Sequence, residues 1–214
     1  MSTFPGSPRL VRGGLVLVDL ESGAVQRVIV LQYNPDSVSR TLQVQATGGD
    51  TADRSEALRL KGPPVETIKL EAELDATDQP GEGSVNVGLQ PQLAAIETVV
   101  YPPSAVLRAN DALARSGTLE IAPMEAPLTL FVWGRNRIVP VRITDLSVTE
   151  EAFDPLLNPL RAKVSLGLRV LSVSDLGFEN KGGGVFLAYQ QQKERLAASA
   201  APGTLSALGI EGIP

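Results

Sequence analysis

Apolar residues alternate with polar or small ones along residues 67–75 and again along residues 161–170. A period of two is typical of a β-strand with one buried and one solvent-exposed face. We therefore expect the apolar row of each segment to face a shared core. These rows are Ile68, Leu70, Ala72 and Leu74 in the first segment, and Ala162, Val164, Leu166, Leu168 and Val170 in the second.

Five further strands are expected from β-branched and apolar runs that are bounded by turn residues. They are residues 10–18, 25–32, 39–46, 128–134 and 138–151. The first two flank a short Gly-containing turn and predict a hairpin. Arg135 and Asn136 are expected to connect the last two as a two-residue hairpin loop. Along residues 138–151 the apolar positions change parity near Thr144 and Asp145, which predicts a β-bulge.

Helical spacing of apolar residues is found in two places. Residues 90–100 show it first, and a Tyr-Pro-Pro sequence ends this predicted helix. Residues 104–125 are ambiguous between a short helix and a loop. The glycines at 182–184 are expected to form a hinge in front of an amphipathic helix at residues 185–200.

These elements predict an α+β fold that is mainly β, an antiparallel sandwich or barrel of about seven strands with one internal helix and a C-terminal helical extension. Residues 1–9 are expected to be a flexible arm, residues 10–175 the β domain, and residues 176–214 the glycine hinge, helix and tail. Residues 47–62 form a long polar loop, and loops longer than about 12 residues in a compact domain are usually functional or disordered.

The amino-acid composition excludes several classes of protein. The 214 residues include no cysteine and no histidine, which excludes disulfides, thiolate chemistry and every histidine-dependent active site. The net charge of −5 gives no general attraction to nucleic acid or anionic lipid, and no apolar stretch is long enough to span a membrane. We therefore expect a structural or binding protein that needs no cofactor, binds no nucleic acid and does not insert into membranes.

The charged residues allow two interpretations. Glu71, Glu73 and Asp75 share one strand face, for which a solvated face is the simpler interpretation. Glu71, Glu73 and Glu150 could alternatively form a hydrolase site without histidine. A sharper hypothesis is an electrostatic contact between this acidic face and a basic face on another subunit. That basic face would contain Arg161, Lys163 and Arg169, with Arg135 and Arg137 nearby.

Trp133 and Phe131 offer a third candidate site. They share one parity of an apolar strand and could stack on a small ligand inside a β-barrel. The alternative is that both rings simply fill the core, which is the commoner role of aromatic residues on a buried strand.

Several motifs resemble those of the contractile injection system tube-like proteins. Phe131-Val132-Trp133-Gly134 is similar to the family's aromatic strand, and the Phe153-Asp154 turn is followed by an Asn-Pro-Leu-Arg-Ala-Lys entry at 158–163 that includes Pro159. Upstream, Tyr33-Asn34-Pro35 resembles the family's turn, residues 64–70 its Pro-x-x-x-Ile-x-Leu strand, and residues 93–102 its helix ending in Tyr-Pro. The resemblance covers about residues 10–175.

The resemblance implies a subunit of a phage-tail-like particle that is assembled in the cytoplasm. Such subunits form rings, six-fold in this family, by pairing edge strands between neighbours, and the expected partners are the spike, tube and baseplate proteins. Many members carry a LysM module after this domain; residues 176–214 take its place here, so anchoring is expected of another protein or of the terminal helix.

Within this family we expect a baseplate hub or tube initiator, with the main inner tube as the alternative, and a ligand-binding β-barrel as an alternative of another class. The loop at 47–62 is expected to dock one ring onto the next. The expected contacts between subunits are Asp50, Asp53, Arg54, Lys61, Glu71, Glu73, Arg161, Lys163 and Arg169.

Overall fold

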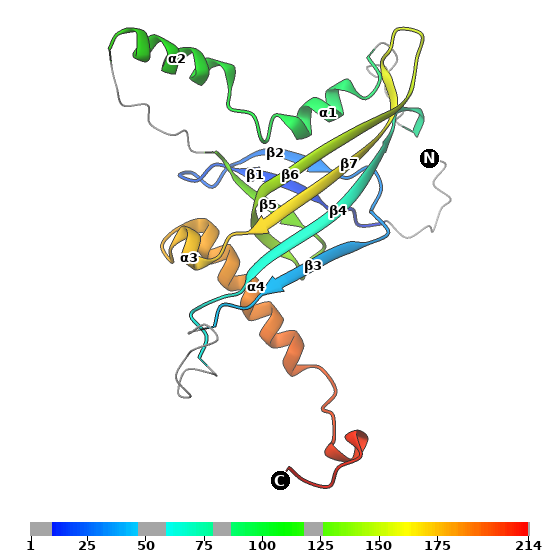
Figure 1. Ribbon diagram of the computed structural model, residues 1–214, viewed down its shortest axis with the longest axis vertical. Coiled ribbons are helices and arrows are strands. Elements are labelled where there is room, and N and C mark those ends of the chain that lie inside the picture. Colours follow the sequence, from blue (N-terminus) through cyan, green and yellow to red (C-terminus); the bar gives the residue numbers. More distant parts are fainter. Residues whose placement is uncertain (1–9, 47–58, 79–86, 118–125, 214) are drawn as a thin grey trace.

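The computed structural model describes residues 10–46, 59–78, 87–117 and 126–213, and the expected arm at 1–9 lies outside them. Its centre is one antiparallel sheet of seven strands in the order β2-β1-β5-β6-β7-β4-β3 (Figure 1). The strands are β1 Gly14–Val18, β2 Val25–Val30, β3 Val38–Gln43, β4 Val65–Asp75, β5 Leu128–Val132, β6 Ile138–Phe153 and β7 Pro159–Val170. The mainly β antiparallel fold is thus confirmed.

The sheet is strongly curled but does not close into a barrel. β2 and β3 are its two edges, yet only seven residues connect them along the chain. Ile29 of β2 and Val38 of β3 both pack into the same apolar cluster, so the sheet curves around a single core. The apolar core fills the inside of this curl, and the expected inward rows of β4 and β7 are all buried in it.

The register confirms the β1–β2 hairpin and the bulge, since the β6–β7 pairing shifts between Ile143 and Asp145. The β5–β6 connection differs from the two-residue loop that we expected. The amide of Trp133 donates a hydrogen bond to the carbonyl of Arg137, so the loop has three residues and begins at Gly134. Gly134 has a φ of +73°, a conformation that glycine adopts without a steric penalty.

Two internal helices are present where one was expected. α1 Gln90–Glu97 buries Leu93 and Ile96 in the core. α2 Ser104–Arg115 resolves the ambiguous region in favour of a helix, but it buries no residue, and Figure 1 shows it extending away from the sheet. Its helical conformation therefore owes little to packing, which explains why the sequence pattern was indecisive.

The C-terminal part contains α3 Val173–Leu176, α4 Lys181–Ala198 and the short 3₁₀ turn Leu205–Leu208; a similar turn, Ala76–Asp78, follows β4. The three glycines are not a hinge, because they form the first turn of α4, which Asn180 caps. A Cβ on Gly183 would lie 2.0 Å from the carbonyl oxygen of Gly177. Gly182 and Gly183 therefore permit close packing against the preceding segment, whereas a Cβ on Gly184 would meet nothing within 4 Å. Further along, Phe186 and Tyr189 of α4 belong to the core.

Candidate functional site

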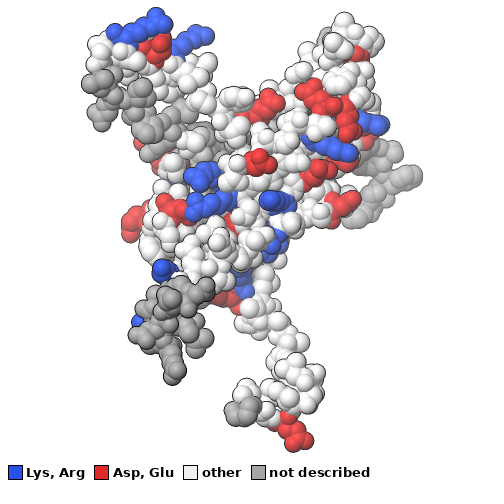
Figure 2. Space-filling model, viewed as in Figure 1, with Lys and Arg blue, Asp and Glu red and all other residues white. Residues whose placement is uncertain are grey.

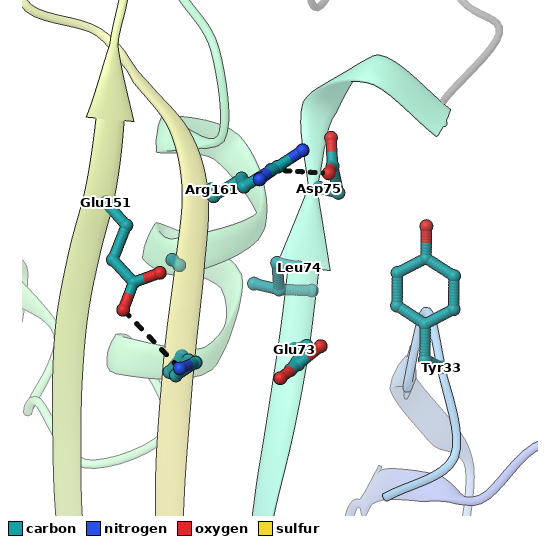
Figure 3. Close-up of a pocket in the computed structure, with 8 residues that line it drawn as sticks. Tyr33, Glu73, Leu74, Asp75, Glu151 and Arg161 are labelled. Carbon is teal, nitrogen blue, oxygen red and sulfur yellow. Dashed lines mark hydrogen bonds and ion pairs between the residues drawn. The ribbon is translucent and has the colours of Figure 1, made fainter.

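The expected acidic and basic faces lie side by side on the outer face of one sheet. β4 and β7 are neighbours, and their register places Glu73 opposite Lys163 and Asp75 opposite Arg161. Arg161 Nε lies 2.9 Å from Asp75 Oδ2, and Lys163 Nζ lies 3.6 Å from Glu151 Oε1 of β6. Together they line an open hollow of about 410 Å³, with the Tyr33 ring standing at its far side (Figure 3).

Two further members of the two faces, Arg169 and Glu71, also have partners within the chain. Arg169 Nη2 lies 2.7 Å from Asp175 Oδ1, and the hydroxyl of Ser165 donates a hydrogen bond to Glu71. Exposed pairs of this kind contribute about 0–1 kcal/mol each. Arg161, Lys163 and Arg169, which we assigned to contacts between subunits, are thus each paired with a carboxylate of the same subunit.

The same register separates the carboxylates of the hydrolase hypothesis. Glu150 lies opposite Ala162, whose other neighbour is the inward-facing Leu74. Glu150 therefore belongs to the opposite face of the sheet from Glu71 and Glu73, because directly paired residues point to the same side. No group of three acidic residues among the described residues could hold a metal ion. Hydrogen bonds from Thr77, and then Arg161, lower the pKa of Asp75, which keeps it ionised rather than a proton donor.

The loop at 47–62 is described only at its base. Asp50, Asp53 and Arg54 lie outside the described residues. Ala46 and Leu60 form an isolated antiparallel bridge, and the amide of Lys61 donates a 2.8 Å hydrogen bond to the carbonyl of Gln45. The two ends of the loop are therefore held next to each other.

A buried ionic cluster joins α4 to the sheet, and the sequence analysis missed it. Glu66 of β4 is 3% exposed, and its carboxylate lies 2.8 Å from Arg40 Nε of β3 and 3.1 Å from Lys193 Nζ of α4. The hydroxyl of Tyr189 donates to the same carboxylate at 3.0 Å, and Lys193 Nζ stands 4.0 Å from the centre of the Tyr189 ring. Glu66 lies on the same strand face as Ile68 and the rest of the inward-facing row. An acidic residue at a position expected to be buried was therefore the sequence signal that could have revealed this cluster.

The pKa values of this cluster follow from its burial and charges. Burial alone would raise the pKa of Glu66, but Lys193 and Arg40 hold the pKa below its ordinary value. Burial, and then the negative charge of Glu66, raise the pKa of Tyr189 to about 12. Glu66 is therefore ionised and Tyr189 is neutral at physiological pH. The cluster fixes α4 to edge strand β3 through a shared carboxylate.

The Tyr33-Asn34-Pro35 motif holds three parts of the chain together between the two sheet edges. Its neighbour Gln32 bonds the backbone of Asp75 through both its amide nitrogen and oxygen, at 2.8 and 2.9 Å. Asn34 accepts from the amide of Gly13 and donates to the carbonyl of Val11, both at 2.9 Å. Tyr33 donates to Asp78. The motif thus serves as a clamp at the point where the curled sheet stays open.

The aromatic motif is part of the packed interior. The Phe131 and Trp133 rings stack with centroids 5.9 Å apart, and Phe131 is 1% exposed. A Cβ on Gly13 would lie 2.3 Å from the Trp133 ring, so the backbone packs directly on the indole. This packing favours the core interpretation over a ligand-stacking site.

The two edge strands are the most exposed parts of the sheet. Of the six residues of β2 only Ile29 is buried, and Val25, Val28 and Val30 are more than half exposed. Among the described residues β2 pairs only with β1, and β3 only with β4. An unprotected edge with exposed β-branched residues is a template for pairing with another chain.

The comparisons with known proteins agree with an assembly function. The family model described as contractile injection system tube protein matches residues 18–172. No curated protein matches the chain. None of the helices in the described part is long and apolar enough to cross a membrane.

Two solved structures are distantly similar. The tail of an empty GTA particle, computed with helical refinement and C6 symmetry, is 14% identical with a TM-score of 0.29, and the alignment covers 74% of this chain and 90% of that one. The virion of a native gene transfer agent particle is 12% identical with a TM-score of 0.28 and the same coverage.

Proposed function

This chain belongs to the family of contractile injection system tube proteins and is a structural component of such a phage-tail-like particle; within the particle, we propose that it forms the baseplate hub or tube-initiator ring between spike and inner tube. The ring consists of about six copies, as the family resemblance implies, and it assembles in the cytoplasm. Its partners are further copies of itself and the spike, tube and baseplate proteins.

The observation that carries this proposal is the pair of free edges in an unclosed sheet. β2 of one copy pairs with β3 of the next, so that the backbone groups left open in the single chain are satisfied between chains. Because the two edges are different strands, the contact is head-to-tail, and a head-to-tail contact closes into a ring when the rotation allows it.

The hub position is favoured over the main tube by α4 and the residues that follow it. A repeating tube needs only the β domain, whereas α4 is an additional element that the Glu66 cluster fixes beside edge strand β3. This location suits an element that contacts the surrounding baseplate. The main inner tube is the alternative, with α4 covering the outside of each ring.

The test is an electron-microscopy and copy-number experiment. Negative-stain images of the purified chain should show rings, and a strictly monomeric chain at high concentration would overturn the proposal. In purified particles, an initiator is present at about one ring per particle whatever the tube length. A copy number that rises with tube length would identify the main tube instead.

A further inference from the structure

The turn between β6 and β7 presents two leucines to solvent on a rigid support. Leu156 and Leu157 are 78% and 77% exposed. Asp154 Oδ1 accepts hydrogen bonds from the amides of Leu156 and Asn158, at 2.7 and 2.8 Å. The Asn158 side chain donates to Asp154 Oδ2 at 2.8 Å, so the Asp154 carboxylate ties the two sides of the turn together.

The same turn carries backbone strain. Leu157 in the turn has a φ of +64°, and Ala152 near the end of β6 has a φ of +51°, both in the left-handed region that disfavours residues with a Cβ. Each such residue costs about 1–2 kcal/mol. In a single chain this strain has no visible benefit, because the strained Leu157 leaves its apolar side chain exposed to solvent. Strain of this kind is typical of positions whose conformation serves an interaction.

A groove elsewhere on the molecule has a mostly apolar lining, which suits an apolar tip of this kind. Its volume is about 340 Å³. Among the described residues that line it, Arg142 is the only charged one, and Val100 on its wall is 45% exposed. The apolar lining includes Val99, Val100, Pro127, Leu128, Ile143 and Leu176.

The tip cannot reach the groove of its own chain. Ile143 in the groove and Phe153 next to the tip both belong to β6, which pairs with β7 over its whole distal part. Ten residues of strand separate them by about 33 Å. Figure 1 accordingly shows the β6–β7 turn and α3, which carries Leu176, on opposite sides of the molecule.

Charge also favours a contact between tip and groove. Arg142 lies directly opposite Arg169, so it faces a like charge, and none of the ion pairs among the described residues includes it. The strand leading to the tip carries Glu150 and Glu151, followed by Asp154. Figure 2 shows a group of acidic side chains toward the β6–β7 end of the sheet, with basic ones beside them, and further basic side chains nearer the middle of the sheet.

We propose that the Leu156–Leu157 tip of one copy docks into the Arg142-containing groove of a neighbouring copy. This inference rests on the proposed self-assembly and adds a second head-to-tail contact to the pairing of edge strands. A protruding tip and a separate groove on one chain give an asymmetric contact, which leads to rings or stacks rather than closed dimers. The strained turn is then compensated by the burial of both leucines.

The absence of cysteine allows a clean cross-linking test. A chain with both Leu156→Cys and Val100→Cys should form disulfide-linked multimers on mild oxidation, and a mixture of the two single variants should stop at dimers. Leu156→Cys combined with Leu208→Cys is the matched control, because Leu208 is 74% exposed but far from the groove, and it should give no ladder.

Rings seen by microscopy without cross-links in the first variant would overturn this docking but not the proposed function. Failure of the unmodified chain to assemble would overturn both.

Charge reversal gives an independent readout of the same contact. Glu150→Arg and Arg142→Glu should each weaken self-association roughly tenfold, measured by sedimentation at equal ionic strength, and the double variant should recover most of the loss. Additive losses in the double variant would contradict the pairing of these two regions.

Discussion

Tyr189 and Glu66 are 123 residues apart in the sequence, yet the tyrosine hydroxyl donates a 3.0 Å hydrogen bond to the buried carboxylate. Through this contact and the Lys193 ion pair, the C-terminal helix is attached to the sheet next to its β3 edge. α4 therefore belongs to the packed molecule rather than to a loose extension.

Replacing Glu66 by Gln should destabilise the chain by about 2 kcal/mol, because hydrogen bonds to a charged group are lost and two cations lose their partner. The measurement is urea unfolding of the monomeric chain. Glu73→Gln is the control, since Glu73 lies on the exposed face and should change stability by less than about 0.5 kcal/mol. Equal losses of unfolding free energy in both variants would mean that the Glu66 cluster contributes no more to stability than an exposed carboxylate does.

The stability difference between the unmodified chain and Glu66→Gln should depend on pH. The pKa of Glu66 is held below its ordinary value of 4.5 in the folded state, so the folded chain favours the ionised form. The resulting stabilisation is present above pH 4.5 and is lost as the pH falls through the folded pKa. The unfolding free energies of the two chains should therefore converge as the pH is lowered from neutral to acidic. A constant gap would show that ionisation of Glu66 is irrelevant.

Substituting Val28 and Val30 together by Glu should prevent ring formation while leaving the fold intact. Both side chains are more than half exposed on edge strand β2, so the monomer loses little, whereas repeated charges on an edge oppose strand pairing. Light scattering reports the assembly state, and circular dichroism the fold. Leu113→Glu on α2 is the control, because Leu113 is 45% exposed and away from both edges. Intact rings from the double variant would exclude β2 as the interface.

Replacing residues 47–58 by a short Gly-Ser linker should leave the unfolding free energy within about 1 kcal/mol, because the Ala46–Leu60 bridge already holds the two ends together. Stacking of rings onto tubes should be lost if this segment docks one ring onto the next. Microscopy of particles assembled with the shortened chain provides the measurement, and normal stacking would contradict that role.

Asp154→Ala should loosen the β6–β7 turn without unfolding the sheet. The variant loses the acceptor of the Leu156 and Asn158 amides, so exchange of these amides with deuterium should accelerate roughly tenfold. Amides in the buried middle of β7 should be unaffected. Unchanged exchange at the turn would mean that its conformation does not depend on Asp154.

The local pattern of the chain was enough to predict all seven strands, the bulge near Asp145 and helix α1, because alternation and helical spacing reflect which side of an element is buried. It was insufficient where a role depends on a distant partner. The triple glycine is typical of a hinge when only its neighbours in the sequence are considered, but it lies inside a helix, where Gly183 packs closely against Gly177.

The same limit applies to the surfaces. An acidic row on β4 and a basic row on β7 can be predicted without the structure, since alternation fixes which residues share a face. The adjacency of the two rows in one chain, and the burial of Glu66 against Arg40 and Lys193, become evident only when the strands are packed together. The order of strands in a sheet is set by long-range packing, and no local periodicity encodes it.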